Sequence, residues 1–531
     1  MRARLICALV AVVIAAPVSA QLENVGSLSF PTSGSPEAQR HFLRGVAILH
    51  SFGWKQAITE FKRAQELQPD FALAYWGETL CYNHPLNAEA DAKNPRAILA
   101  RLGPDTAARL AKAPTKREKG FLGAVEVLWG EGDWRARRVA YMQAMARLHA
   151  EFPQDDEATT FYALSLLSAA RAESDSTFRP EMKAGALAMD VFRRNPNHPG
   201  ATHYIIHAFD DPVHAPLALE AALTYAKIVP AVSHAVHMPT HIFIQHGMWQ
   251  EVAHQNIRAF NIAKDLWQPG DSVGDMVHSG DWGQYGFLQQ GDYAGARERM
   301  RAFEEMAEKT KQARFTSALA LMKARYIIET EEWTNQSISE KDNPLTHLAN
   351  GFSAVRTGDL EAAQKILSWL VARTRIQGAQ PAAAAAGVHA DHDAAGPAPA
   401  ATVPESSKSS WIMASELEAL LAEAKGNRDA AIAKLREAVK VEETMRPPNG
   451  AADPIKPSHE LLGEVLLRAG KHAEAAAAFD AGLLRMPNRP RSLYGAAVAH
   501  VAAGRSDVGR ARWTLLQSFW KGKPFTAPAF K

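Results

Sequence analysis

A period of 34 residues constrains this chain more than any other feature of its sequence. Two stretches near opposite ends carry small residues, an aromatic residue and a proline at matching positions of the period. They are Gly45, Ala57, Phe61, Ala64 and Pro69 in one stretch, and Gly463, Ala475, Phe479, Gly482 and Pro487 in the other. Small residues let the two helices of a hairpin approach closely, the aromatic side chain fills the space between them, and proline ends the second helix. The period therefore predicts an all-α fold, an α-solenoid of stacked helical hairpins.

Residues 377–410 interrupt the hairpin pattern. This stretch is rich in alanine, proline, glycine and serine and has no apolar periodicity, which predicts a disordered insertion. Ala363 and Ala431 hold the same position of the repeat on either side of it, and they lie two periods apart. We therefore predict one solenoid over residues 21–376 and a second set of helical hairpins over residues 411–531.

The first 20 residues have the composition of a secretory signal peptide. Two arginines precede an apolar run from Leu5 to Ala16, and small residues precede the expected cleavage point after Ala20. The apolar run is too short to span a bilayer, and no later stretch reaches the roughly 20 apolar residues that a transmembrane helix needs. We expect the chain to be exported, periplasmic or secreted, with no membrane insertion after signal cleavage.

The charge balance argues against nucleic acid as a partner. Without the two arginines of the signal peptide, 57 of the 59 basic residues remain, against 57 acidic residues. A chain without net charge or basic runs has little attraction for a polyanion. Cys81 is the one cysteine after the signal peptide, so no intramolecular disulfide can form and stability must come from packing.

Histidines recur in step with the period. The pair His203 and His207 returns 34 residues later, and the register of the repeat places each pair at positions 5 and 9 of the first helix of a hairpin. In a solenoid of such hairpins, positions 2, 5 and 9 line the concave surface, where ligands bind. In three consecutive repeats these positions hold His203 and His207, then His234, His237 and His241, then His278, Asp281 and Tyr285.

We predict that this groove holds a divalent transition metal: zinc, copper or iron. Imidazole is a good ligand for these ions, ligands four residues apart share one helix face, and packed helices lie about 8–10 Å apart. Asp281 is expected to complete the ligand set or to orient a histidine, and Asp210 to line the groove and orient one. The predicted ligands are His203, His207, His237, His241, His278 and Asp281.

Further positions are expected to line the groove. His50 and His84 are one period apart, both near the inner end of a first helix, and Trp76 holds position 5 of its repeat. His198 precedes a proline, which favours a role in capping a helix rather than in binding.

Pro239 is the weakest point of the metal hypothesis. If a helix begins there, His237 precedes it and loses the simple four-residue spacing to His241. Two alternatives stay open: a polar groove that binds a peptide or a partner protein without metal, as in an interaction scaffold, and histidines with a structural role. Whether the chain is an enzyme is also open; if it is, Tyr285 or Asp281 is expected to handle protons.

The repeat spacing resembles the tetratricopeptide repeat superfamily over most of residues 37–518. The strings AYWGETLCYNHPLN, HPGATHYIIHAFDDPVHAPL, SHAVHMPTHIF and HSGDWGQYGFLQ also resemble a group of exported bacterial tetratricopeptide proteins. The resemblance implies that these strings form one functional unit, and it supplies no reaction. Its polar members are His50, Asn83, His84, His203, His207, His237, His241, His278 and Asp281.

Overall fold

The computed structural model describes residues 20–87, 92–175, 177–334, 339, 341–377 and 405–530. The first part of the chain contains β1 (Ala20–Leu22), β2 (Gly26–Leu28), α1 (Pro36–His50), α2 (Trp54–Leu67), α3 (Ala72–Leu80), α4 (Lys93–Leu102), α5 (Thr106–Ala111), α6 (Lys116–Leu128), α7 (Trp134–Glu151), α8 (Asp156–Glu173), α9 (Arg179–Arg194), α10 (Pro199–Ala208), the 3-10 helix η1 (Ala215–Ala218), α11 (Leu219–Ile228), α12 (Ser233–His237), α13 (Pro239–Gln245) and α14 (Trp249–Leu266). The second part contains α15 (Gly274–Gln289), α16 (Tyr293–Thr310), α17 (Ala313–Thr330), α18 (Pro344–Thr357), α19 (Leu360–Gln377), α21 (Glu405–Ala424), α22 (Arg428–Glu442), α23 (Ser458–Arg468), α24 (His472–Arg485), α25 (Pro490–Ala502) and α26 (Ser506–Phe519).

Consecutive helices pair into hairpins, and the residues of the period sit where the hairpins meet. Phe61 of α2 packs between Gly45 of α1 and Gly77 of α3. A methyl group added to Gly45 or Gly77 would lie 2.8 or 2.3 Å from the Phe61 ring. Phe479 of α24 packs in the same way against a glycine of α23 and a glycine of α25. The predicted all-α solenoid of tetratricopeptide-like hairpins is confirmed.

A two-stranded antiparallel hairpin, β1 and β2, precedes the helices. Its Ser27 backbone N–H donates to the Asn197 carbonyl at 2.9 Å, in the turn before α10. Gly26 has a φ of +88°, and an added methyl group would lie 2.6 Å from the same carbonyl oxygen. This contact joins the start of the described chain to the helix that carries His203 and His207.

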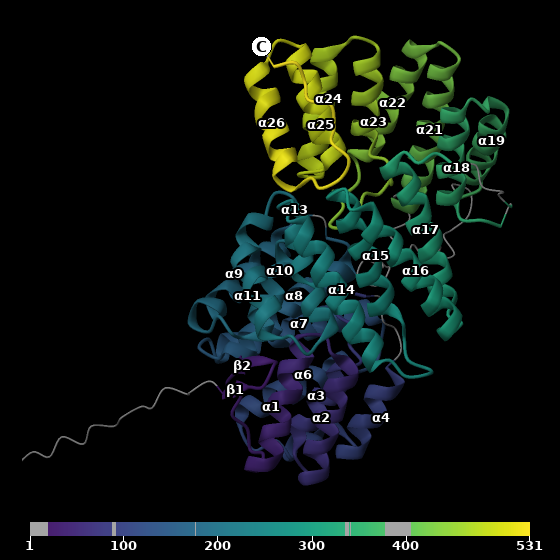
Figure 1. Cartoon of the computed structure of the whole chain (residues 1–531). Helices are drawn as coiled ribbons and strands as arrows, with labels where there is room; N and C mark the ends of the chain where they lie inside the picture. Colours follow the sequence, from purple (N-terminus) through teal and green to yellow (C-terminus); the bar gives the residue numbers. More distant parts are fainter. Residues whose placement is uncertain are drawn as a thin grey trace, which may run out of the picture.

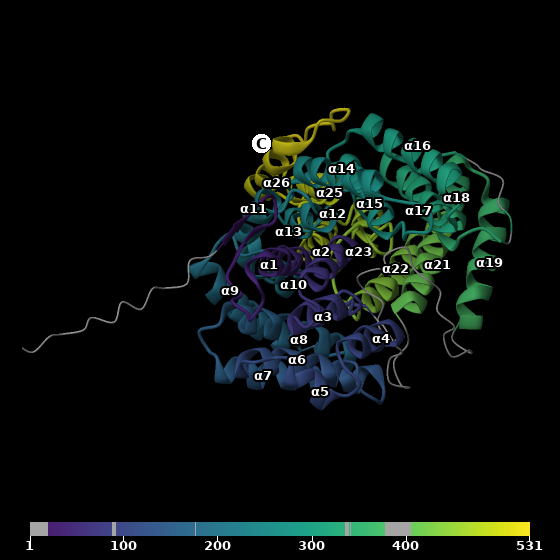
Figure 2. The ribbon, with the colours of Figure 1, turned by 90° about the horizontal axis from the view of Figure 1, so that it is seen from below.

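The solenoid curls until its C-terminal helices contact its middle. In Figure 1, α21 to α26 lie above the N-terminal helices, and in Figure 2 α1 lies beside α10, against which it packs. Asn488, just before α25, accepts from the Trp249 indole N–H at 3.2 Å and donates its side-chain amide to the Gln245 carbonyl at 3.3 Å. Lys521 N–H donates to the Gln290 carbonyl at 2.7 Å. These bonds join segments more than 200 residues apart in sequence.

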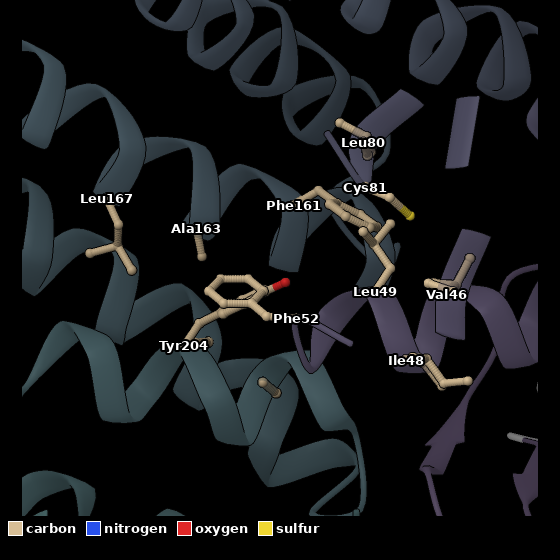
Figure 3. Packing of buried hydrophobic residues seen from close by; sticks show 14 of the residues in the cluster. Val46, Ile48, Leu49, Phe52, Leu80, Cys81, Phe161, Ala163, Leu167 and Tyr204 are labelled. Atoms are coloured by element: carbon tan, nitrogen blue, oxygen red, sulfur yellow. The ribbon is translucent and has the colours of Figure 1, made fainter. Parts of the chain in front are cut away.

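The largest apolar core spans α1 to α15. Aromatic side chains such as Phe52, Phe161 and Tyr204 fill it (Figure 3). A second core occupies α17 to α26. Ala451, in the connection between α22 and α23, belongs to the first core. The C-terminal hairpins are therefore linked to the N-terminal ones by apolar packing as well as by hydrogen bonds.

The predicted signal peptide and insertion lie mostly outside the described residues, and one end of the insertion is helical. Residues 1–19 of the predicted signal peptide lie outside the described residues, as do residues 378–404 of the predicted insertion. Helix α21 begins at Glu405, so the last residues assigned to the insertion, 405–410, are helical. None of the described helices combines the length and the apolar character needed to cross a bilayer.

Candidate metal centre

Six of the histidines form two triads. In each triad the three ligand nitrogens lie within 4.8 Å of one another. The first triad is His203, His207 and His234, and the second is His237, His241 and His278. Helix α10 supplies two rings of the first triad, the short helix α12 supplies one ring to each triad, and α13 and α15 supply the rest. The single predicted site is therefore two neighbouring groups, and His234, expected only to line the groove, is a member of the first triad.

The first triad is oriented through a backbone carbonyl. His203 donates Nδ1–H to the carbonyl oxygen of His50 at 2.6 Å, and its Nε2 lies 3.1 Å from Nε2 of His234. Because Nδ1 carries the proton, the neutral His203 ring presents a lone pair at Nε2. An outer hydrogen bond of this kind fixes the tautomer in metal-binding histidines.

In the second triad, two outer partners fix two tautomers. His237 donates Nδ1–H to Oδ1 of Asn256 at 2.6 Å, and the Asn256 amide is oriented because its Nδ2 donates to Thr240 Oγ1 and to the Val252 carbonyl. His241 donates Nδ1–H to Oδ2 of Asp210 at 2.6 Å, as expected of Asp210.

The inner nitrogens of His237 and His241 consequently face each other as lone pairs. Their Nε2 atoms are 3.0 Å apart, which is the distance of a hydrogen bond. A neutral form of either ring has its one proton on Nδ1, so two neutral rings place two acceptor nitrogens against each other. Two lone pairs at this distance repel unless a proton or a metal ion lies between them. A nitrogen of His278 joins them, and a third ligand suits a metal ion but not a shared proton.

The two triads are adjacent. The ring centroids of His234 and His237 are 6.3 Å apart, and those of His207 and His241 are 6.4 Å apart. Since α12 carries one ring of each triad only three residues apart, its backbone fixes the relative position of the groups. The six imidazoles form one cluster with two centres.

The cluster is buried, whereas the sequence suggested an open groove. Five of the six rings are buried, from His203, which is fully buried, to His278, which is 7% exposed, and His207 is partly buried. Trp282 covers the second triad, with its ring centroid 4.3 Å from that of His241. The connection between α22 and α23 packs over Trp282, since a methyl group on Gly450 would lie 2.3 Å from its ring. The predicted histidine cluster is therefore buried, and a segment far away in the sequence packs against it through Trp282.

Pro239 divides the helix, as the sequence warned, but the geometry survives. Helix α12 ends at His237 and α13 begins at Pro239, while Met238 between them keeps helical angles, φ −52° and ψ −39°. His237 and His241 therefore stay about one turn apart on one face. The break removes a backbone hydrogen bond without separating the two rings.

Asp281 and Tyr285 lie outside both triads. The Asp281 carboxylate accepts from Nη1 of Arg325 at 2.8 Å, and both side chains are buried. The Tyr285 hydroxyl faces Arg489, and burial raises the pKa of Tyr285 to about 12. Asp281 is thus the partner of an arginine in the structure rather than a member of a ligand group.

The other predicted groove positions are dispersed. Trp76 is fully buried among aromatic rings and is a core residue. His84 stacks on Trp54, with centroids 5.1 Å apart, and Asn83 lines an apolar cavity nearby. His50 is also fully buried, in a third polar group with Glu157 and His198.

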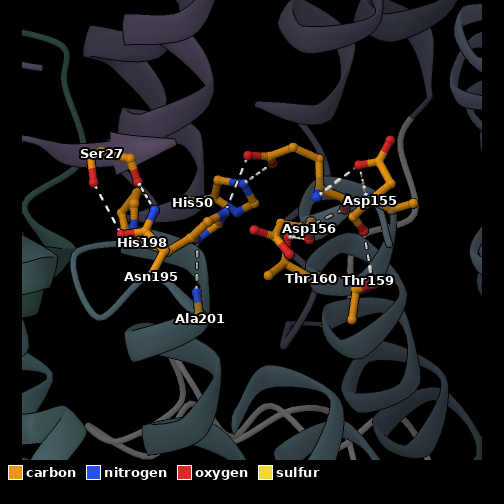
Figure 4. A network of polar contacts seen from close by, with 12 residues as sticks. Ser27, His50, Asp155, Asp156, Thr159, Thr160, Asn195, His198 and Ala201 are labelled. Atoms are coloured by element: carbon orange, nitrogen blue, oxygen red, sulfur yellow. Dashed lines mark hydrogen bonds and ion pairs between the residues drawn. The ribbon is translucent and has the colours of Figure 1, made fainter. Parts of the chain in front are cut away.

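That third group is a satisfied hydrogen-bond network (Figure 4). His50 donates Nε2–H to Glu157 at 2.8 Å and accepts the Tyr204 hydroxyl at Nδ1. His198 accepts the Ala201 backbone N–H, which confirms its predicted capping role, and its Nε2 lies 3.2 Å from Glu157. Every ring nitrogen of His50 and His198 therefore has a proton donor or acceptor within the network. The group supports the first triad because the His50 carbonyl holds His203.

Burial and hydrogen bonding set the charge of this network. Burial lowers the pKa of His50 and so favours its neutral ring. Burial alone would raise the pKa of Glu157, but the neighbouring His50 and His198 lower it to about 2. Glu157 is therefore an ionised acceptor held by neighbouring imidazoles.

Several residues that contact the triads or their hydrogen-bond partners have no sequence pattern that predicts this role. Asn256 lies one helix away from His237, and Trp282 reads as a hydrophobic position of α15. Glu157 is 107 residues from His50, and no motif or period of the sequence links the two residues. A search for acceptors at hairpin spacing from each histidine would find Asn256, 19 residues from His237, but not Glu157.

No family model matches the chain, and no curated protein matches it. Among solved structures, it is similar to chains in the APC/C hetero-tetramer Cut9-Hcn1 and in the TPR domain of P58(IPK). The first is 11% identical with a TM-score of 0.30, covering 92% of this chain and 75% of that chain. The second is 12% identical with a TM-score of 0.22, covering 88% and 99%. A human IFIT1 dimer with PPP-AAAA is 11% identical with a TM-score of 0.32, covering 91% and 90%.

Proposed function

We propose that this protein binds two transition-metal ions, one at each histidine triad, and uses them for metal-dependent chemistry. The observation that carries the proposal is the pair of Nε2 atoms of His237 and His241, 3.0 Å apart with both Nδ1 protons already donated outward. Such an arrangement is stable when a cation lies between the lone pairs. The outer acceptors are those that metal-binding histidines ordinarily have.

The ligand chemistry selects the class of metal. Each triad offers three neutral nitrogens, which suit zinc, copper and iron and do not suit magnesium or calcium. Three protein ligands leave a coordination position for water or a substrate, as in catalytic rather than structural sites.

An interaction scaffold is the alternative function, because stacked helical hairpins commonly bind peptides on their concave face. A peptide that used the histidines would need them exposed, and five of the six are buried. The burial therefore favours metal over a peptide at this position. We also propose that the chain is exported and meets its metal outside the cytoplasm, an expectation that depends on the signal peptide.

Metal analysis of tag-free protein tests the proposal. After reconstitution with zinc, copper or iron and desalting, we expect about two equivalents per chain. The double variant His207→Ala/His234→Ala should keep about one equivalent, because the second triad is intact. His254→Ala, on the exposed side of α14, is the matched control and should keep both ions. Less than about 0.2 equivalents in the wild-type protein would overturn the proposal.

A further inference from the structure

The connection between α22 and α23 is unusually long. It runs over residues 443–457, and connections of more than about 12 residues are uncommon and usually serve as lids or binding loops. The next three connections along the chain are residues 469–471, 486–489 and 503–505. Both ends of the long connection are held together, because the Ser458 backbone N–H donates to Glu442 Oε2 at 2.8 Å. A loop with joined ends is an Ω-loop, and we call residues 443–457 the Ω-loop.

The tip of the Ω-loop crosses to the metal centre. The Asn449 side-chain amide donates at 2.9 Å to the oxygen of Asp210 that orients the second triad. Gly450 packs against the ring of Trp282, which covers the same triad. Ala451 is 3% exposed and belongs to the largest core. In Figure 1, α22 and α23 lie above the helices that carry the triads, so the loop reaches from one set of helices to the other.

The base and the tip are attached to different parts of the solenoid. Ile455, near the base, belongs to the second core, whereas Ala451 belongs to the first. On the other side of the tip, Arg446 Nη2 donates to the Asp175 carbonyl at 2.8 Å, and its guanidinium lies 4.8 Å from the centre of the Phe178 ring. A local segment can open while the rest of the fold stays intact. The base can therefore keep its contacts in the second core while the tip leaves the first.

The burial of the triads makes such a movement necessary for metal entry. Five of the six imidazoles are buried, so the closed structure offers a hydrated ion no ready access to them. The tip packs on Trp282, and Trp282 packs on His241, so moving the tip uncovers the second triad from one side. Opening should therefore act on the second ion more than on the first.

We propose that the Ω-loop is a lid, latched by Asn449, that opens to let a metal ion reach the second triad and then closes over it. The role in metal entry rests on the proposed function, whereas the movement of the loop does not. Because an open lid helps an ion to leave as well as to enter, loss of the latch should change rates more than affinity.

Thiol labelling of metal-free protein measures the movement. Cys81→Ala removes the one cysteine after the signal peptide, and Ala451→Cys then places a thiol at the buried tip. This thiol should react slowly with a disulfide reagent, through opening of the lid. Asn449→Ala should speed the reaction about fivefold, the effect of one hydrogen bond. Ala476→Cys, at a fully buried position of the second core, is the reference and should react more slowly, with no response to Asn449→Ala.

Asn488→Gly is the matched control. The Asn488 side chain also joins the C-terminal helices to the N-terminal ones, by its bond to the Gln245 carbonyl, but it lies outside the Ω-loop. Its φ of 61° suits glycine. The control should leave the labelling of the Ala451→Cys thiol unchanged. An equal rise in Asn488→Gly, no rise in Asn449→Ala, or equal rates for the thiols of Ala451→Cys and Ala476→Cys would each overturn the lid.

Zinc release tests the role in metal entry. Zinc-loaded protein is mixed with an excess of a chromophoric chelator, and the release of each ion is followed. Asn449→Ala should speed the release of one ion about fivefold, speed its loading by a similar factor and leave the other ion unchanged. Unchanged zinc release, or equal acceleration of both ions, would overturn this role. If the protein holds no zinc, copper or iron, metal analysis rejects the proposed function, and thiol labelling still decides whether the loop opens.

Discussion

Removing the Asp210 carboxylate should lower the metal affinity of the second triad and leave the affinity of the first triad unchanged. Asp210 accepts Nδ1–H of His241 at 2.6 Å, which holds the ring with Nε2 inward and makes that nitrogen more basic. Asn449 donates its amide to the same carboxylate oxygen at 2.9 Å. Loss of such an outer partner typically lowers metal affinity about 10- to 100-fold.

The loss of metal affinity should depend on which side chain replaces Asp210. Asp210→Ala removes both the charge and the acceptor, and we expect about a 100-fold loss at the second triad, or about 2.7 kcal/mol. Asp210→Asn keeps an acceptor oxygen and loses the charge, so about a tenfold loss is expected. Asn449→Ala leaves the bond to His241 intact and should have the smallest effect of the three.

Competition with a chromophoric zinc chelator resolves the two sites. The wild-type protein should give two affinities, and Asp210→Ala should lower one of them and leave the other unchanged. The reasoning would be refuted if both affinities fell equally, because the first triad is held by the His50 carbonyl and not by Asp210. It would also be refuted if neither affinity changed.

Further predictions concern packing, charge and ligand assignment. Gly450→Ala places a methyl group 2.3 Å from the Trp282 ring and should lower the free energy of unfolding by about 1–3 kcal/mol. Gly123→Ala, whose added methyl group meets open space, is the control and should not destabilise the protein. Thermal denaturation measures both variants. Glu157 has a pKa near 2 in the folded protein against 4.5 for an ordinary carboxyl, so its contribution to stability is complete above pH 4.5 and is lost as the pH falls towards 2. Glu157→Gln should flatten this part of the pH profile of unfolding, and an unchanged profile would contradict the assignment. Asp281→Asn breaks a buried ion pair and should destabilise the fold by about 3–5 kcal/mol while leaving the metal content unchanged; a lost equivalent of metal in folded protein would show that Asp281 is a ligand.

The sequence was informative wherever the structure depends on neighbouring repeats. The spacing of Gly45 and Phe61 predicted how the first hairpin packs, and the recurrence of His203 and His207 predicted that these side chains share a surface with the next repeat. Both features arise from contacts within about one period, where the register of the helices determines which side chains meet.

The sequence-based predictions differ from the structure where the contacts join residues far apart in the sequence. Asp281 is neutralised by Arg325, 44 residues away, and the connection carrying Asn449 reaches Asp210 across 239 residues. No periodicity encodes such pairings. The division into two triads was missed for a different reason. The repeat positions place all these rings on one surface, whereas α12 contributes His234 to one triad and His237 to the other.

Burial of the two triads affects which metal ions they can hold. Imidazole is a neutral ligand, so the two triads offer a bound ion no negative charge, and the Asp281 carboxylate is paired with Arg325. Two divalent ions would bring four positive charges into a buried site, where uncompensated charge is expensive. Asp210 offsets one of these charges through His241. Copper reduces the remaining imbalance because its cuprous form carries a single charge and accepts three nitrogen ligands. We therefore expect anaerobic cuprous copper to compete better than zinc for both triads, and displacement of bound copper by equimolar zinc would contradict this charge argument.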